Sequence, residues 1–231
     1  MSLIYYTDTG SKRPEQAFGG KLRGVVFAGG NCPDAVFLKK IAGAAEILAA
    51  ADSGLSVMEE AGLTPHWIVG DMDSLDDPAR LEKYPSGAVL RFPAEKDLTD
   101  TELALNLLKE KGCDEVWISG GGGGRIDHIF AIRALFDREN CPDRWFPGNE
   151  EVRCLKSGGR FNAELPRGSR VSVFPVGAQP WQAESSGLKW PLSGLAWENG
   201  GLGLSNAAPD GSFEIRSVCG RFLVVMPLFF G

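Results

Sequence analysis

VWISGGGGGRIDHIFAIRALF, residues 116–136, contains a short apolar run, five consecutive glycines and a longer apolar run. We expect a buried strand over 116–118, because short β-branched and aromatic runs bounded by glycine favour strands. Over 127–136 we expect a mostly buried helix. Glycines between a strand and a helix let backbone N–H groups approach an anion such as phosphate. A flexible linker is the weaker alternative, because linkers rarely join two buried elements.

The same alternation of strands and helices occupies the chain before this segment. Thr99 and Glu102 form the T-x-x-E pattern of a capping box, and Gly112 ends the helix that follows. Because strands separated by helices pair in parallel, we expect an α/β fold with a doubly wound, mostly parallel sheet. The expected strands are 22–28, 47–51, 67–69 and 88–92, and the expected helices are 33–45, 57–61 and 99–111.

After about residue 150, glycine and proline separate short runs of alternating polarity, and no helical period of useful length is present. This pattern favours a small antiparallel β-sandwich or barrel. We therefore expect an α/β domain over 21–140, a linker within 138–148 and a β-sandwich domain over 150–231. The expected strands are 170–175, 182–185, 203–205, 213–218 and 221–226.

Composition narrows the function classes. The 231 residues carry a net charge of −6, which argues against a broad nucleic-acid or membrane surface. The five cysteines are odd in number and include no CxxC pair, which disfavours a zinc knuckle or a disulfide framework. Unpaired thiols fit a reducing cytosol, and no apolar run is long enough to cross a bilayer. We expect a cytoplasmic protein that binds neither nucleic acid nor membrane.

Three short motifs place aspartates next to expected strand or helix ends. In GDMDS, Asp71 and Asp73 face the same side if the segment is extended, and both can bind Mg²⁺; a simple turn is the alternative. In EKDLTD, Thr99 and Asp100 lie where a helix begins and favours anions; capping explains them but leaves Asp97 unexplained. In AADSG, Asp52 ends a strand, and capping of the next helix by Ser53 is an equally good interpretation.

The glycine run continues into Arg125 and Asp127. Arg125 can bind phosphate oxygens with two hydrogen bonds, and Asp127 can orient or deprotonate a hydroxyl or bind a metal. The run lacks the GK[ST] ending of a Walker A loop. With only two histidines and no GxSxG elbow, Ser-His-Asp chemistry is disfavoured.

Two motifs of the second half resemble a ring-binding surface. Trp190, in GLKWPL, can offer a flat face to an aromatic or cationic ring, and Ser205 and Asn206, in GLSN, can hydrogen-bond the edge of that ring. A core tryptophan and a turn are the alternative, which the sequence by itself favours.

In this order, GDMDSL, KDLTDTELAL, GGGGGRIDH, GLKWPL and LGLSN resemble the thiamine pyrophosphokinase family over about residues 22–228. The resemblance implies an ATP- and Mg²⁺-binding α/β domain, a thiamine-binding β-sandwich, and a homodimer whose active sites combine both subunits. It implies transfer of the pyrophosphoryl group of ATP to thiamine, giving thiamine diphosphate and AMP. The alternatives are a pyrophosphokinase for another hydroxymethyl heterocycle, such as a pterin, or a non-catalytic sensor of nucleotide or thiamine.

Matched motif by motif, the family's catalytic carboxylates correspond to Asp71, Asp73, Asp97, Asp100 and Asp127. Three of these, Asp71, Asp73 and Asp100, are the expected Mg²⁺ ligands. The expected nucleotide- and phosphate-binding residues are Gly122, Gly123, Gly124, Arg125, Ser74 and Thr99, and the expected thiamine-binding residues are Trp190, Ser205 and Asn206. The chain departs from the family at AADSG, where ADGGAN is common.

Overall fold

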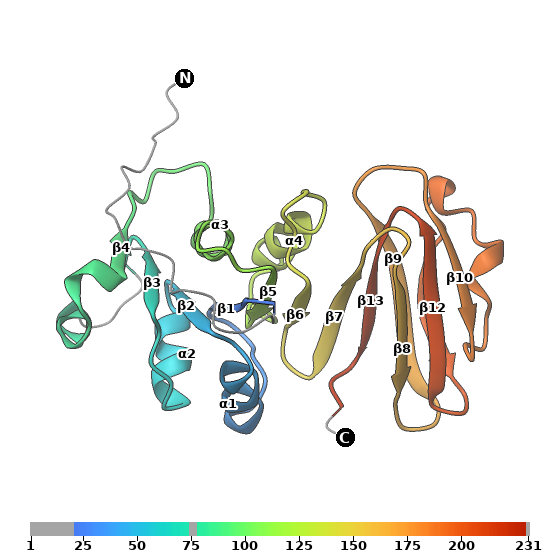
Figure 1. Ribbon diagram of the computed structural model, residues 1–231, viewed down its shortest axis with the longest axis horizontal. Helices are drawn as coiled ribbons and strands as arrows, with labels where there is room; N and C mark the ends of the chain where they lie inside the picture. Colours follow the sequence, from blue (N-terminus) through green and yellow to red (C-terminus); the bar gives the residue numbers. More distant parts are fainter. Residues whose placement is uncertain (1–20, 74–77, 230–231) are drawn as a thin grey trace.

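A computed structural model describes residues 21–73 and 78–229 and has an α/β half beside an antiparallel β half (Figure 1). One sheet of ten strands runs through both halves, in the order β11-β9-β13-β7-β6-β5-β1-β2-β3-β4. The predicted fold class is therefore confirmed. Within the described residues, no helix is long and apolar enough to cross a membrane. Ser74, a predicted phosphate-binding residue, lies outside the described residues.

Five parallel strands form the α/β part of the sheet, in the order β5-β1-β2-β3-β4. Their bounds are β1 Arg23–Phe27, β2 Ile47–Ala51, β3 Trp67–Gly70, β4 Val89–Arg91 and β5 Glu115–Ser119. In β1, Val25 and Phe27 face one core and Val26 faces the other, so the sheet is covered on both sides. A strand buried on both faces is apolar throughout, as the sequence of β1 predicts.

Two helices cover each face of this part of the sheet. Residues of α1, Ala35–Gly43, and α2, Gly54–Glu60, belong to one core, and residues of α3, Asp100–Glu110, and α4, Ile126–Leu135, belong to the other. Asp34 caps α1, accepting a hydrogen bond from the Phe37 N–H at 2.9 Å. Two short 3₁₀ segments, Pro78–Lys83 and Ser86–Ala88, precede β4.

Helix α4 differs from the buried helix that the sequence predicts. Ile132 and Leu135 are its buried residues, whereas Ile126 is 59% exposed and Phe130 is 65% exposed. The helix is apolar around most of its circumference, but the sheet and α3 cover one side of it. We predicted burial from the apolar character of the helix alone. That character does not indicate whether the side of α4 that faces away from the sheet is covered by the same chain.

The expected linker over 138–148 is also corrected by the structure. It contains β6, Arg144–Phe146, which pairs in parallel with β5 and antiparallel with β7, Glu150–Leu155. Trp145 is buried, and its indole N–H donates to the Gly120 carbonyl at 2.7 Å. The segment thus joins the two halves through the sheet itself. The prolines that suggested a linker lie outside β6, at positions 142 and 147.

The antiparallel half is a sandwich of four strands of the large sheet against a second sheet, β10-β12-β8. Phe222 and Val224 from one sheet and Phe213 and Ile215 from the other share one core. The sequence missed β7 and β8. The remaining bounds are β8 Arg160–Glu164, β9 Ser169–Val176, β10 Gln182–Ser186, β11 Gly203–Ala208, β12 Ser212–Cys219 and β13 Arg221–Pro227, with 3₁₀ turns at Leu192–Gly194 and Trp197–Asn199.

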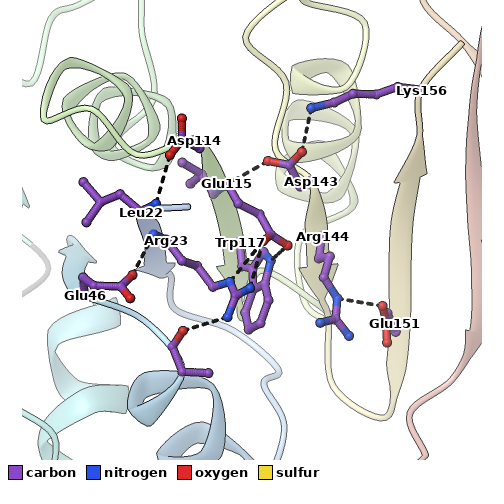
Figure 2. A network of polar contacts seen from close by, with 12 residues as sticks. Leu22, Arg23, Glu46, Asp114, Glu115, Trp117, Asp143, Arg144, Glu151 and Lys156 are labelled. Carbon is purple, nitrogen blue, oxygen red and sulfur yellow. Dashed lines mark hydrogen bonds and ion pairs between the residues drawn. The ribbon is translucent and has the colours of Figure 1, made fainter. Parts of the chain in front are cut away.

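A polar network ties the strands together at the edge where β1, β5 and β6 begin (Figure 2). The guanidinium groups of Arg23 and Arg144 lie 4.3 and 4.6 Å from the Trp117 ring. Glu115 accepts hydrogen bonds from Arg23 and, at 2.7 Å, from the Trp117 indole. Glu151 accepts one from Arg144 at 2.8 Å, which extends the network to β7. Cation–π contacts and ion pairs here link four strands at one end.

Replacing Trp145 by alanine tests whether β6 belongs to the core. The Trp145 side chain is buried and hydrogen-bonded, so we expect the free energy of unfolding to fall by about 3–5 kcal/mol. Trp190→Ala also removes a tryptophan side chain, but one that is 53% exposed. This change should lower the free energy of unfolding by less than about 1 kcal/mol. Urea denaturation followed by circular dichroism measures both. Equally small losses would contradict a core position for β6.

Candidate active site

A cleft of about 580 Å³ opens where the parallel strands end. Its lining comes from the segments that follow β1, β2, β3 and β5 and from the start of α3. Parallel strands deliver the residues after them to one edge of the sheet, which is why motifs far apart in sequence meet there. The polar residues of the lining are Asp52, Ser53, Asp71, Lys96, Asp97, Thr99, Asp100, Thr101, Arg125 and His128.

Three aspartates gather at one side of this cleft. Carboxylate oxygens of Asp52, Asp71 and Asp73 lie within 4.8 Å of one another. The Asp73 N–H donates to Asp71 Oδ1 at 3.2 Å, and Met72 between them has φ +66°. The segment is therefore the turn that the sequence offered as the alternative to an extended segment, and this turn brings both carboxylates together. Asp52 Oδ1 is buried without a hydrogen-bond partner among the described residues, which favours a cation at this position.

The Lys96 ammonium lies close to the cleft carboxylates Asp71 and Asp100. Its Nζ lies 3.8 Å from Asp71 Oδ2 and 3.2 Å from Asp100 Oδ1. Burial raises the pKa of Asp100, although Lys96 opposes that rise. The hydrogen bond from the Asp73 N–H lowers the pKa of Asp71. The two carboxyls thus differ in proton affinity because one is desolvated and the other is hydrogen-bonded.

Thr99 begins α3 at the mouth of the cleft. Its Oγ1 accepts a hydrogen bond from the Glu102 N–H at 3.2 Å, so the predicted cap is confirmed. The Glu102 carboxylate does not complete a capping box but forms an ion pair with Arg138, beyond the end of α4. The cap fixes the first turn of α3, which carries Asp100.

The glycine run forms a packed loop between β5 and α4. Gly120 has φ +96°, and a Cβ there would lie 2.1 Å from the Ala28 carbonyl oxygen. Gly122 exchanges backbone hydrogen bonds with Asn31, at 2.6 and 3.1 Å. Gly121, Gly122 and Gly123 line the cleft. Glycine is required at position 120 by both conformation and space, so the loop is held in place and is not a flexible linker.

Arg125 follows the loop and is paired with Asp127. The guanidinium donates to both Asp127 oxygens, at 3.2 and 2.6 Å, and Arg125 lines the cleft. This hydrogen bond lowers the pKa of Asp127, which weakens it as a proton acceptor. Asp127 is not among the residues that line the cleft, so its direct action there stays a proposal.

The predicted ring-binding residues lie in the β-sandwich, away from the cleft (Figure 1). Trp190 is exposed, and the Lys189 ammonium lies 4.5 Å from its ring. Asn206 is buried, and its side chain bonds the Trp190 backbone, accepting at 3.1 Å and donating at 2.6 Å. Ser205 is exposed and has φ +55°. The Asn206 amide thus holds Trp190 in position.

Two charged residues of the cleft, Asp52 and Lys96, were absent from the predicted site. Asp52 was weighed as the end of a strand next to a helix cap, yet Ser53 makes no capping hydrogen bond through its side chain. Lys96 was given no role. The signal for Asp52 was its place after β2, next to β3 in the sheet, since residues that follow neighbouring parallel strands lie close together.

Comparison with known proteins accords with this geometry. The family model described as thiamin pyrophosphokinase, catalytic domain, matches residues 38–141. This segment of the chain is therefore similar to the catalytic domain of the thiamine pyrophosphokinase family. A thiamine pyrophosphokinase of Bacillus subtilis strain 168 is 29% identical over 147 residues, which are 62% of this chain and 68% of that protein.

Solved structures of this family share the fold. The thiamin pyrophosphokinase of Geobacillus thermodenitrificans has a TM-score of 0.69 at 24% identity, covering 89% of this chain and 97% of that chain. The enzyme of Candida albicans has a TM-score of 0.66 at 16% identity, covering 89% and 90% of the two chains. The sandwich as well as the α/β half is therefore common to these structures.

Asparagine at position 100 should stabilise the fold at neutral pH. Because the pKa of Asp100 is raised in the folded state, ionisation of this carboxyl opposes folding once the pH exceeds the unfolded-state pKa of about 3.9. Below that pH the carboxyl is protonated in both states and the penalty vanishes. We expect Asp100→Asn to melt above the wild type at pH 7, and the gap to close as the pH falls toward about 3.

Thermal denaturation from pH 3 to pH 8 measures this gap. Asp97→Asn is the matched control, because the Asp97 side chain is exposed at the same cleft and its replacement should leave the melting temperature unchanged. An Asp100→Asn protein that melts below the wild type at pH 7 would contradict the expected penalty.

Proposed function

We propose that this protein transfers the pyrophosphoryl group of ATP to the hydroxyl of thiamine, giving thiamine diphosphate and AMP. The observation that carries the proposal is the cleft itself, in which clustered aspartates face a glycine loop and Arg125. Such a site offers ligands for a divalent cation on one side and donors for phosphate oxygens on the other. The match to the thiamin pyrophosphokinase catalytic domain and the similarity to a thiamine pyrophosphokinase of Bacillus subtilis support the choice of thiamine and ATP.

The aspartates fit Mg²⁺. Asp71 and Asp73 offer two carboxylates, and the unpartnered, buried Asp52 Oδ1 gives a third that gains from a cation. Asp100, bridged to Asp71 through Lys96, completes the group that we assign to the metal. When bound, Mg²⁺ neutralises charge on the polyphosphate. A cation held by these carboxylates would replace the Lys96 ammonium as their partner, and Lys96 would then be available to bind a phosphate oxygen.

The remaining residues position the reactants. Pyrophosphoryl transfer needs alignment and charge neutralisation more than a covalent nucleophile. The Gly123 N–H and the Arg125 guanidinium bind phosphate oxygens, and Asp127 orients Arg125. Gly122, whose N–H donates to the Asn31 carbonyl, holds the loop in place beside them. The hydroxyl of thiamine passes its proton to a cleft carboxylate. Asp127 is poorly suited to this step, because its hydrogen bonds with Arg125 lower its pKa.

The thiamine ring is held by a second copy of the chain. The described residues that line the cleft all lie between Ala28 and Ile132, whereas Trp190 and Ser205 are exposed in the sandwich half of the chain. A ring stacked on Trp190 would be remote from phosphates in the cleft of the same chain. The exposed apolar residues Ile126 and Phe130, on α4 beside the cleft, offer a surface for the partner. A homodimer with composite sites follows.

Asp71→Asn tests the carboxylate assignment. Loss of one charge from the metal group should lower kcat by about 100-fold or more without unfolding the protein. The reaction with Mg-ATP and thiamine is followed by mass spectrometry of the products. Asp210→Asn is the control, because Asp210 and its partner Arg167 are exposed at 80% and 78% in the sandwich. ADP with thiamine monophosphate, or turnover of a hydroxymethyl pterin in place of thiamine, would contradict the proposed reaction.

A mixture of two inactive variants tests the composite site. Co-expressed Asp71→Asn and Trp190→Ala chains form heterodimers as about half of all dimers. In each heterodimer one site combines an intact cleft with an intact Trp190, so activity should return to about a quarter of the wild-type value. If both residues serve the site of their own chain, no site is intact and co-expression restores nothing.

A further inference from the structure

Cys141 and Cys154 lie side by side where the two halves of the molecule join. Their Sγ atoms are 3.8 Å apart, and neither cysteine forms a disulfide. Cys141 precedes β6, and Cys154 lies in β7. The backbone N–H of Cys154 donates to the Asp143 carbonyl at 2.9 Å. Backbone pairing therefore holds the two sulfurs next to each other. The S–S bond of a disulfide is about 2.05 Å long, so the two sulfur atoms need to move closer by less than about 2 Å to form one.

The surroundings favour a thiolate at Cys141. Arg221 Nη1 lies 3.1 Å from Cys141 Sγ, and the same guanidinium donates to the carbonyls of Asp137 and Arg138, which fix its position. The hydrogen bond from Cys154 and the charge of Arg221 lower the pKa of Cys141 to about 6, whereas the contact with Cys141 raises the pKa of Cys154. The thiolate is the nucleophilic form of cysteine.

The pair lies close to the surface of the molecule. Cys141 is buried, Cys154 is partly exposed, and Arg221, which contacts Cys141, lines a surface hollow of about 420 Å³ together with Lys156 and Ser157. Lys156 is held there by Asp143, at 2.7 Å, as Figure 2 shows. These cationic groups stabilise a thiolate and stand outside the cleft described above.

We propose that Cys141 and Cys154 are a redox-active pair that hydrogen peroxide converts to a reversible disulfide across the β6–β7 junction. The Cys141 thiolate attacks one peroxide oxygen, the O–O bond breaks, and the departing hydroxide takes a proton to become water. The sulfur of Cys154 then attacks the resulting sulfenic acid; the S–S bond forms, the S–O bond breaks, and the hydroxide leaves with the Cys154 proton as water. Two thiols and one peroxide thus give one disulfide and two waters.

The test exposes the folded, full-length chain to stoichiometric hydrogen peroxide, alkylates the remaining thiols and digests the protein with trypsin. Cleavage after lysine and arginine places Cys141 in ENCPDR, residues 139–144, and Cys154 in CLK, residues 154–156. We expect these two peptides to appear joined, two hydrogens lighter than their sum, and to separate after treatment with dithiothreitol. Cys32, Cys113 and Cys219 should stay alkylated and serve as internal references.

Two variants sharpen the result. Cys154→Ser removes the resolving thiol, so Cys141 should stop at a sulfenic acid that dimedone traps. Cys219→Ser is the matched control and should form the cross-link as the wild type does. Circular dichroism verifies that both variants are folded. The proposal is overturned if ENCPDR and CLK stay alkylated at a peroxide dose that oxidises Cys32 or Cys219, or if wild-type Cys141 is oxidised without joining Cys154.

Discussion

The end of strand β1 touches two neighbouring connections so closely that only glycine fits, and the cleft depends on those contacts. A Cβ on Gly54 would lie 2.0 Å from the Phe27 carbonyl oxygen, and one on Gly120 would lie 2.1 Å from that of Ala28. Side chains there would push α2 and the glycine loop away from the sheet. The segments that carry Asp52 and Arg125 reach the same cleft because backbone packs directly on backbone.

The edge of the parallel sheet where the strands begin stabilises the fold, whereas the edge where they end carries the candidate active site. Where the strands begin, charges are matched, as Arg23 and Arg144 flank Trp117 and each pairs with a glutamate (Figure 2). Where they end, the carboxylates of Asp52, Asp71 and Asp73 crowd together, and Asp100 shares Lys96 with Asp71. The repulsion between these carboxylates lowers the stability of the fold, and the ion pairs at the opposite edge and the two hydrophobic cores must offset it. This imbalance supports our proposal that the cleft binds a cation.

Much of the fold could be predicted from local patterns. The strand over 47–51 and the Thr99 cap were predicted residue for residue, because a buried parallel strand and a capped helix each have a strong sequence signal. Strand β6 was missed because it has only three residues between prolines, and its burial depends on β5 and β7. The exposure of Phe130 could not be predicted either, since it depends on what surrounds α4 in three dimensions.

The candidate site teaches a different lesson, because local and functional interpretations of its motifs were treated as alternatives. GDMDS is a turn, with Met72 at φ +66°, and that turn is what directs Asp71 and Asp73 toward Asp52. Thr99 caps α3, and that cap fixes the turn from which Asp100 enters the cleft. A local hydrogen bond therefore does not compete with the proposed catalytic role; it sets the direction of the side chain to which we assign that role. Asp52 was left out of the predicted site for the same reason: capping by Ser53 was an equally good interpretation of its motif, although the position after β2 places a carboxylate beside the one after β3.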